Sequence, residues 1–143
     1  MNTHGQQLAE TFLKMINTHD PDLVDQFEAE GYVNHEALFS AAGREANRQF
    51  WHAFFVALPD LSASMEDLVI AGDRVVGRFV YRGTHTGDFM GIPASGNAVE
   101  MRSIDIWRVE DGVFAEHWDE INALQVFQQM GALPPLGGPG ARA

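Results

Sequence analysis

The sequence AVEMRSIDIWRVEDGVFAEHWDEI, residues 98–121, determines the class of fold that we expect for this chain. Apolar and polar residues alternate on both sides of EDG, which is the period of a strand whose successive side chains point to opposite faces. We therefore predict strands at Ala98–Val109 and Val113–Ile121. A three-residue hairpin loop with Gly112 in the left-handed conformation would join them.

The rest of the chain divides into a helical part before this hairpin and a short helical part after it. The period of two extends back to residue 62, and Val, Phe, Tyr and Thr are common there, which favours two more strands. Before residue 60 the apolar residues recur at helical spacing instead. The remaining predicted elements are helices at Thr3–Thr18, Pro21–Phe27 and Ala46–Leu58, strands at Ser62–Ala71 and Arg74–Thr86, and a short helix that contains Leu124 and Phe127.

Helices that are segregated from antiparallel strands in this way predict an α+β domain. In such a domain the helices cover one face of a curved sheet, and the resulting cup readily encloses a pocket. With 143 residues the chain has the usual length of one domain, so we expect residues 1–143 to form a single unit. The Pro- and Gly-rich end, residues 133–143, is expected to be loose.

The composition excludes several classes of function. Hydrophobic residues make up 45% of the chain, which is enough for a core, and a net charge of −11 disfavours nucleic acids and membrane surfaces as partners. The chain has no cysteine, so thiol chemistry is excluded and a reducing compartment is favoured. No apolar stretch approaches the ~20 residues of a spanning helix, and Met1–Gly5 does not resemble a signal peptide. We therefore expect a cytoplasmic protein.

Three ionisable residues fall on the apolar face of the predicted hairpin. If Val109 pairs with Val113, Asp105 lies opposite His117, and Asp119 lies diagonal to Asp105. Burial raises the pKa of an unpaired carboxyl group, and a raised pKa beside an imidazole is what a general acid or base needs at neutral pH. From the spacing alone, an Asp–His pair that merely pins the hairpin is an equally good interpretation.

Metal binding is the alternative chemistry for this face. His117 and Asp119 could be two ligands on one strand, joined by His35 or His85. However, no HExxH, HxH or Cys cluster supplies a recognisable ligand set, and residues 91–96 lack the remaining features of a phosphate-binding loop. We therefore predict neither a metal nor an organic cofactor.

The opposite face of the same two strands carries apolar side chains among charged ones. Ile104, Ile106, Phe114 and Trp118 all have the parity that points away from the proposed pocket. Apolar groups on a solvated face favour a partner, so we predict a homodimer built on this convex side of the sheet.

Five segments, taken in their order and spacing, carry a family resemblance that covers nearly the whole chain. They are YVNH at 32–35, GDFMGIPASG at 87–96, DIWRVEDG at 105–112, EHWD at 116–119 and QQMGALP at 128–134. Together they resemble the SnoaL-like polyketide cyclases, a branch of the nuclear-transport-factor-two-like superfamily. The resemblance implies a cone-shaped α+β fold, in which a curved antiparallel sheet wraps around the N-terminal helices and encloses a pocket.

The resemblance also implies an activity. Cyclases of this kind close a ring of a polyketide-like, carbonyl-containing molecule by an intramolecular aldol condensation, without a cofactor. The family's catalytic aspartate matches Asp119, which would remove a proton alpha to a carbonyl, beside His117 and Asp105. The best-studied cyclases have a histidine near the place of Asp105, so this second carboxylate departs from the family pattern. The residues that we expect to bind substrate are Asn34, His35, Phe54, Tyr81, His85, Met101 and Trp107.

The sequence is also compatible with other functions. Proteins similar to these cyclases include cofactor-independent hydroxylases, and Asp119 could instead activate water for hydrolysis or hydration of a small apolar molecule. A non-catalytic dimer that binds a small ligand explains the acidic surface equally well. A carrier, however, has no need of an ionisable group in an apolar wall.

Overall fold

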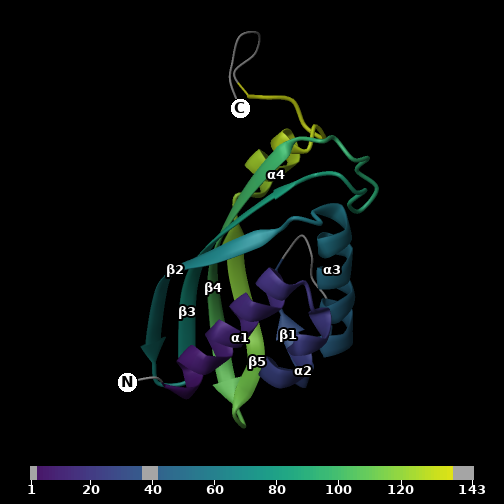
Figure 1. Ribbon diagram of the computed structural model, residues 1–143. Coiled ribbons are helices and arrows are strands. Elements are labelled where there is room, and N and C mark those ends of the chain that lie inside the picture. Colours follow the sequence, from purple (N-terminus) through teal and green to yellow (C-terminus); the bar gives the residue numbers. More distant parts are fainter. Residues whose placement is uncertain (1–2, 37–41, 137–143) are drawn as a thin grey trace.

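Residues 3–36 and 42–136 are described by a computed structural model. The chain forms α1 (His4–Thr18), η1 (Pro21–Leu23), α2 (Val24–Phe27), β1 (Glu28–Asn34), α3 (Arg44–Ala57), β2 (Ser62–Ala71), β3 (Arg74–Thr84), β4 (Ala98–Glu110), β5 (Val113–Ile121) and α4 (Ala123–Gln129). The helices α1 to α3 lie against one face of a curved, open sheet, and α4 lies at one end of it (Figure 1). This confirms the α+β class and the cup of sheet and N-terminal helices.

Local chemistry favours both ends of α1. Thr3 caps α1 by accepting a hydrogen bond from the backbone N–H of Gln6 at 3.2 Å, and α1 ends at His19 in the left-handed conformation.

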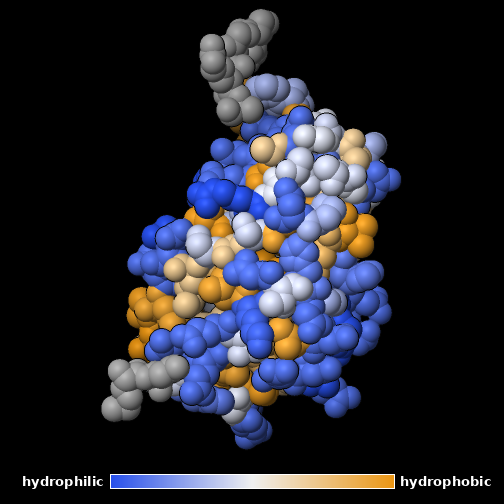
Figure 2. All heavy atoms as spheres, viewed as in Figure 1, coloured by the Kyte–Doolittle hydropathy of each residue, from blue (hydrophilic) through white to orange (hydrophobic). Residues whose placement is uncertain are grey.

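None of the helices in the described ranges is long and apolar enough to cross a membrane. Their outer surface is mostly hydrophilic, with apolar groups in small patches (Figure 2).

Phe12 of α1 joins the helices to the sheet. Its ring meets four other aromatic rings edge-on, with centroids between 5.2 and 6.0 Å apart, from α2, α3, β3 and β4. Edge-to-face pairs of this kind stabilise a core beyond the area that they bury, by about 0.5–1.5 kcal/mol each. The partners are Phe27, Trp51, Phe79 and Trp107.

The sheet has the strand order β1-β5-β4-β3-β2, with β1 parallel to β5 and the other neighbours antiparallel. The bounds predicted for β2 and β5 are confirmed. The strand β1 was not predicted, and it adds one parallel pair at the edge of the predicted antiparallel sheet. Residues 28–34, EAEGYVN, contain a glycine and three polar residues, so they have little strand propensity, and only pairing with β5 makes them a strand.

The β4–β5 hairpin has a different register from the predicted one. Glu110 pairs with Val113, so the turn has two central residues, and both Asp111 and Gly112 have positive φ angles, 51° and 81°. The left-handed Gly112 is confirmed, but the three-residue loop is wrong. Two positive φ values are typical of the type I′ turn, whose twist matches that of paired strands.

A β-bulge then shifts this register again. Arg108 pairs with Glu116 and Val109 with Phe114, which leaves Ala115 as the extra residue on β5. Because of these two changes, Asp105 lies directly opposite Asp119, and His117 lies opposite Trp107. The predicted pairing of Asp105 with His117 is wrong, but the turn and the bulge together leave the face of all three ionisable residues unchanged.

The bulge also moves Phe114 to the inside. Its side chain is fully buried and stacks on the ring of Trp107, with centroids 4.6 Å apart. The expectation that Phe114 contributes to a convex apolar patch is therefore wrong, because an extra residue in a strand inverts the parity on one side of it. Ile104 and Ile106 remain exposed on that convex side, at 53% and 39%.

Candidate active site

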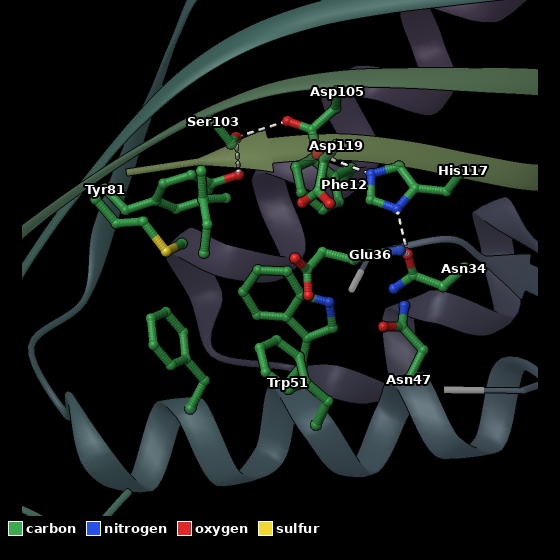
Figure 3. Close-up of a pocket in the computed structure, with 14 residues that line it drawn as sticks. Phe12, Asn34, Glu36, Asn47, Trp51, Tyr81, Ser103, Asp105, His117 and Asp119 are labelled. Atoms are coloured by element: carbon green, nitrogen blue, oxygen red, sulfur yellow. Dashed lines mark hydrogen bonds and ion pairs between the residues drawn. The ribbon is translucent and has the colours of Figure 1, made fainter. Parts of the chain in front are cut away.

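A pocket lies between the inner face of the sheet and helix α3 (Figure 3). The volume that the centre of a water-sized sphere can reach inside it is about 50 Å³, which is room for several waters. A ligand with several rings would therefore extend beyond it. The lining residues are Phe12 from α1, Asn34 from β1, Glu36 just after β1, Asn47, Phe50, Trp51 and Phe54 from α3, Tyr81 from β3, Met101, Ser103 and Asp105 from β4, and His117, Asp119 and Ile121 from β5.

A chain of hydrogen bonds crosses the sheet wall of this pocket (Figure 3). The Nε2 atom of His117 lies 2.8 Å from Oδ1 of Asp105, and Ser103 donates its hydroxyl proton to Oδ2 of Asp105 at 2.6 Å. The hydroxyl of Tyr81 lies 3.0 Å from Oγ of Ser103. Burial raises the pKa of Tyr81 well above its usual value, so this phenol stays protonated. Strands β3, β4 and β5 thus hold Asp105 and His117 in one orientation.

Asn34 holds the other side of the His117 ring through Nδ1. The backbone N–H of Glu36 donates to Oδ1 of Asn34 at 3.0 Å, so the oxygen of this amide faces the same side as Nδ1 of His117, 3.0 Å away. The Nδ1 atom must therefore be a donor. The other ring nitrogen, Nε2, faces the carboxylate of Asp105. The amide nitrogen of Asn34 is left on the pocket side (Figure 3).

Asp119 is the carboxyl group in this cluster that has a free oxygen. Its Oδ1 atom is buried and has no hydrogen-bond partner among the described residues. Burial raises the pKa of Asp119 to about 7; attraction to His117 opposes the rise, and repulsion by Asp105 and Glu36 adds to it. A carboxyl group with that pKa can accept or release a proton at neutral pH, which is what acid/base catalysis requires.

The opposite wall of the pocket is apolar and aromatic. On α3, Phe50, Trp51 and Phe54 follow one another at helical spacing and face the cavity. Met101 and Ile121 continue this surface on the sheet. The pocket therefore combines an apolar surface for a ring system with one polar wall that can exchange protons.

Seven of the ten predicted site residues line this pocket. They are Asp105, His117, Asp119, Asn34, Phe54, Tyr81 and Met101.

The structure places the other three predicted site residues outside the lining of this pocket. His35 lies outside it, 2.7 Å from Glu116 and stacked on Trp118 with ring centroids 5.1 Å apart. It points outward because neighbouring side chains in extended backbone alternate, and Asn34 points inward. His85 is fully buried elsewhere, with Nδ1 2.8 Å from Oγ of Ser95.

Trp107, the third of them, supports the site from behind. It is 1% exposed, and its ring stacks on that of His117 with centroids 5.3 Å apart. It therefore holds the imidazole in place without contacting the cavity.

Seven residues that line the pocket were not predicted to belong to the site. Ser103 shares the predicted inner face of β4, so strand parity could have identified it. Asn47 lies three, four and seven residues before the aromatic residues of α3, and a polar residue in such a stripe is a detectable signal. Glu36 follows β1 in irregular structure and carries no periodic signal. The seven are Phe12, Glu36, Asn47, Phe50, Trp51, Ser103 and Ile121.

The same cluster has the composition of a metal site. One ligand atom from each of Asp105, His117 and Asp119 lies within 4.8 Å of the other two. Both ring nitrogens of His117, however, already form hydrogen bonds with side-chain oxygens, so a metal would have to displace Asp105 or Asn34 from the ring. The arrangement suits proton transfer better than metal binding.

Comparison with known proteins agrees with this fold. The model of the SnoaL-like polyketide cyclase family matches residues 6–130. A search of curated proteins finds no match. Among solved structures, TsrD from Streptomyces laurentii is 38% identical, with a TM-score of 0.84 over 91% of this chain and 96% of that one. IdmH from Streptomyces antibioticus, provisionally described as a polyketide cyclase, is 28% identical, with a TM-score of 0.74 over 90% and 99%.

A polyketide cyclase from Bacillus cereus, also provisionally described, is 26% identical, with a TM-score of 0.78 over 92% of this chain and 83% of that one. The match of the family model extends from α1 to the end of α4. It includes all five strands and the three ionisable residues Asp105, His117 and Asp119. The chain belongs to the SnoaL-like polyketide cyclase family.

Proposed function

We propose that the protein is a cofactor-independent, polyketide cyclase-like enzyme that closes a ring by an intramolecular aldol-type reaction. The observation that carries this proposal is the carboxyl group of Asp119, which has an unpartnered oxygen and a pKa of about 7 beside an apolar cavity. The family, and the provisional cyclase assignments of two of the solved relatives, support the same reaction class.

The reaction needs one base that later acts as an acid. Asp119 takes a proton from the carbon alpha to a carbonyl of the substrate, and the electron pair of that C–H bond forms an enolate. The amide nitrogen of Asn34 is available to donate a hydrogen bond to the enolate oxygen. The enolate carbon then attacks a second carbonyl of the same molecule, a C–C bond forms, and the new alkoxide takes the proton back from Asp119. No electrons enter or leave, so no redox cofactor is required.

The first step can be tested without the natural substrate. 2-Tetralone is a small neutral ketone whose C1 protons are alpha to the carbonyl and adjacent to an aromatic ring. In D₂O at pH 7.5, we expect the protein to accelerate the replacement of these protons by deuterium over the rate in buffer, as measured by NMR. Exchange at the buffer rate with the ketone bound would contradict the proposal.

We also propose that the protein is a homodimer built on the convex side of the sheet. Ile104, Ile106 and Trp118 form a shallow apolar surface there with Arg74, whose guanidinium lies 5.8 Å from the Trp118 ring centre. Isolated apolar surface of this kind is stabilised by burial against a second copy.

Light scattering is expected to give a mass of about twice 15.8 kDa at micromolar concentrations. Ile106→Glu places a charge in the apolar surface and is expected to reduce the mass to that of one chain. Glu30→Gln on β1 serves as the control, because Glu30 is exposed and lies outside this surface. A wild-type protein that scatters as one chain would contradict the dimer.

We further predict that the reaction needs no metal. Both ring nitrogens of His117 form hydrogen bonds, with Asn34 and with Asp105, so neither is free to bind an ion. Elemental analysis of the purified protein is expected to find less than stoichiometric zinc, iron or manganese, and EDTA is expected to leave the exchange rate unchanged. If the wild type holds stoichiometric metal and His117→Ala loses it, the cluster is a metal site and this prediction is wrong.

A further inference from the structure

A buried amide stands out on the aromatic wall of the pocket. Along α3, Asn47 precedes Phe50, Trp51 and Phe54 by three, four and seven residues, so all four share one face of the helix. Asparagine is a poor helix former, and an apolar residue here would complete the stripe. Asn47 is nevertheless 5% exposed, so its amide requires a buried polar partner.

The partner is Glu28, the first residue of β1, which lies behind Asn47 and is 2% exposed. Asn47 donates its Nδ2 proton to Oε2 of Glu28 at 2.6 Å. The other carboxyl oxygen, Oε1, is buried without a hydrogen-bond partner in the described ranges. Arg44 does not pair with this carboxyl group, because its Nη1 donates to the backbone carbonyl of Glu28 and its Nε pairs with Asp25.

This pair is an unfavourable way to fill the core. A buried carboxyl group with an unsatisfied oxygen destabilises a fold, and two well-packed apolar residues would occupy the same space without that penalty. Burial also raises the pKa of Glu28 to about 8, against the opposing effects of Asn47 and Arg44. Departures from packing rules of this kind concentrate at functional sites.

The amide of Asn47 has capacity left for a ligand. Its second N–H hydrogen and its Oδ1 atom make no hydrogen bond to the described residues, and the side chain extends from α3 towards Asn34 and His117 (Figure 3). Tyr81 lies at the other end of the pocket, where the lining is more apolar (Figure 3). The polar end therefore carries two amides from different elements, β1 and α3.

We infer that Asn47 binds a carbonyl or hydroxyl oxygen of the substrate, and that Glu28 is a positioning residue that orients the Asn47 amide. The inference rests on the proposed function, because it takes the pocket ligand to be the substrate. It assigns an orientation to that ligand: the oxygen-bearing end lies between Asn34 and Asn47, and the apolar ring lies towards Phe54. The pocket thereby selects oxygen-bearing rings over hydrocarbons of the same shape.

The test compares two probes of nearly equal size, 2-tetralone and the hydrocarbon tetralin, by ligand-observed NMR titration. The measured quantity is the ratio of their dissociation constants, which cancels general effects of a variant on the cavity. In the wild type we expect the ketone to bind more tightly. Asn47→Leu is expected to reduce this preference by about 3–10-fold, which is the typical contribution of one hydrogen bond.

Glu28→Leu and Glu28→Gln separate positioning from packing. Glu28→Leu removes the acceptor and is expected to reduce the preference as much as Asn47→Leu does, whereas Glu28→Gln retains an acceptor oxygen and is expected to keep it. The double variant with Leu at both positions is expected to lose no more than Asn47→Leu alone, because both changes remove one interaction. Melting curves identify variants that are folded.

Several outcomes would overturn the inference: a wild-type ratio near one, a ratio unchanged in Asn47→Leu, equal weakening of both probes in Glu28→Leu, or loss of the preference in Glu28→Gln. The proposed function fails separately. If the wild type distinguishes the probes through Asn47 but does not exchange the C1 protons of 2-tetralone, the inference stands and the cyclase chemistry does not. If the wild type exchanges these protons but the ratio of dissociation constants does not depend on Asn47, the cyclase chemistry stands and the inference does not.

Discussion

Asp119→Asn is expected to slow deuterium exchange into 2-tetralone by about 10²–10⁴-fold, the usual contribution of a positioned general base. The variant keeps the shape of the side chain but removes the group that accepts the proton. Affinity for the ketone is expected to change little, so the loss appears in the rate constant at saturation.

Glu120→Gln provides the matched control for this experiment. Glu120 is the next residue of β5 and is exposed on the convex side, outside the lining of the pocket, and its charge is the smallest of the named causes that act on the pKa of Asp119. We expect Glu120→Gln to exchange at nearly the wild-type rate. Full activity in Asp119→Asn would show that another group is the base and that the proposed mechanism is wrong.

The pH dependence of wild-type exchange follows from the same carboxyl group. Asp119 acts as a base only when it is ionised, and its pKa is raised to about 7. The rate is therefore expected to rise with pH through about 7 and to level off above it. A profile that levels off near pH 4 would indicate an exposed carboxylate with an ordinary pKa instead.

Glu28→Gln is expected to raise the free energy of unfolding at pH 7 by about 3 kcal/mol. The pKa of Glu28 is raised from 4.5 to about 8 in the folded protein, chiefly by burial, so folding at pH 7 requires this carboxyl group to take up a proton. The difference of about 2.5 units between pH 7 and the unfolded pKa, at 1.36 kcal/mol each, gives that magnitude. Glutamine is neutral at every pH, so folding of the variant requires no proton uptake at this position.

The sign of the effect defines the pH window for the measurement. Because the folded pKa is raised, the stabilising contribution of Glu28 is complete below its unfolded pKa of 4.5 and is lost as the pH rises through about 8. Urea unfolding at pH 5 and pH 8 is therefore expected to show a small advantage of Glu28→Gln at pH 5 and a large one at pH 8.

Glu30→Gln is the control for stability, because Glu30 lies on the same strand and is exposed. We expect it to change the free energy of unfolding by less than about 0.5 kcal/mol at either pH, as is usual for surface positions. If Glu28→Gln instead lowered stability equally at both pH values, Glu28 would be ionised and stabilised in the fold.

Much of this site follows from patterns that are local in the chain. Alternation along β4 and β5 assigns Asp105, His117 and Asp119 to one face. The turn and the bulge each shift the pairing by one residue, and the two shifts together leave these side chains on the same face. The segments that resemble the cyclases add the expectation for Asn34, which the structure places against His117. The helical stripe around Phe54 is evident from spacing, although spacing does not show which of its residues face a cavity.

Other features depend on contacts between distant segments. The bulge at Ala115 forms where Phe114 gains a buried position against Trp107, and this gain in packing is absent from the sequence of β5 alone. His35 follows Asn34 in the chain, yet it points outward to Glu116 and Trp118 on β5.

By itself, the sequence determined the α+β class, the extent of β2 and β5 and the face that carries the ionisable residues, because hydrophobic periodicity and turn chemistry act over a few neighbouring residues. The tertiary structure alone decided that Asp119 faces Asp105, that residues 28–34 form an edge strand, and that Glu28 meets Asn47 across 19 positions of the chain. These features depend on burial and desolvation, which exist only once separate elements have packed together and excluded water.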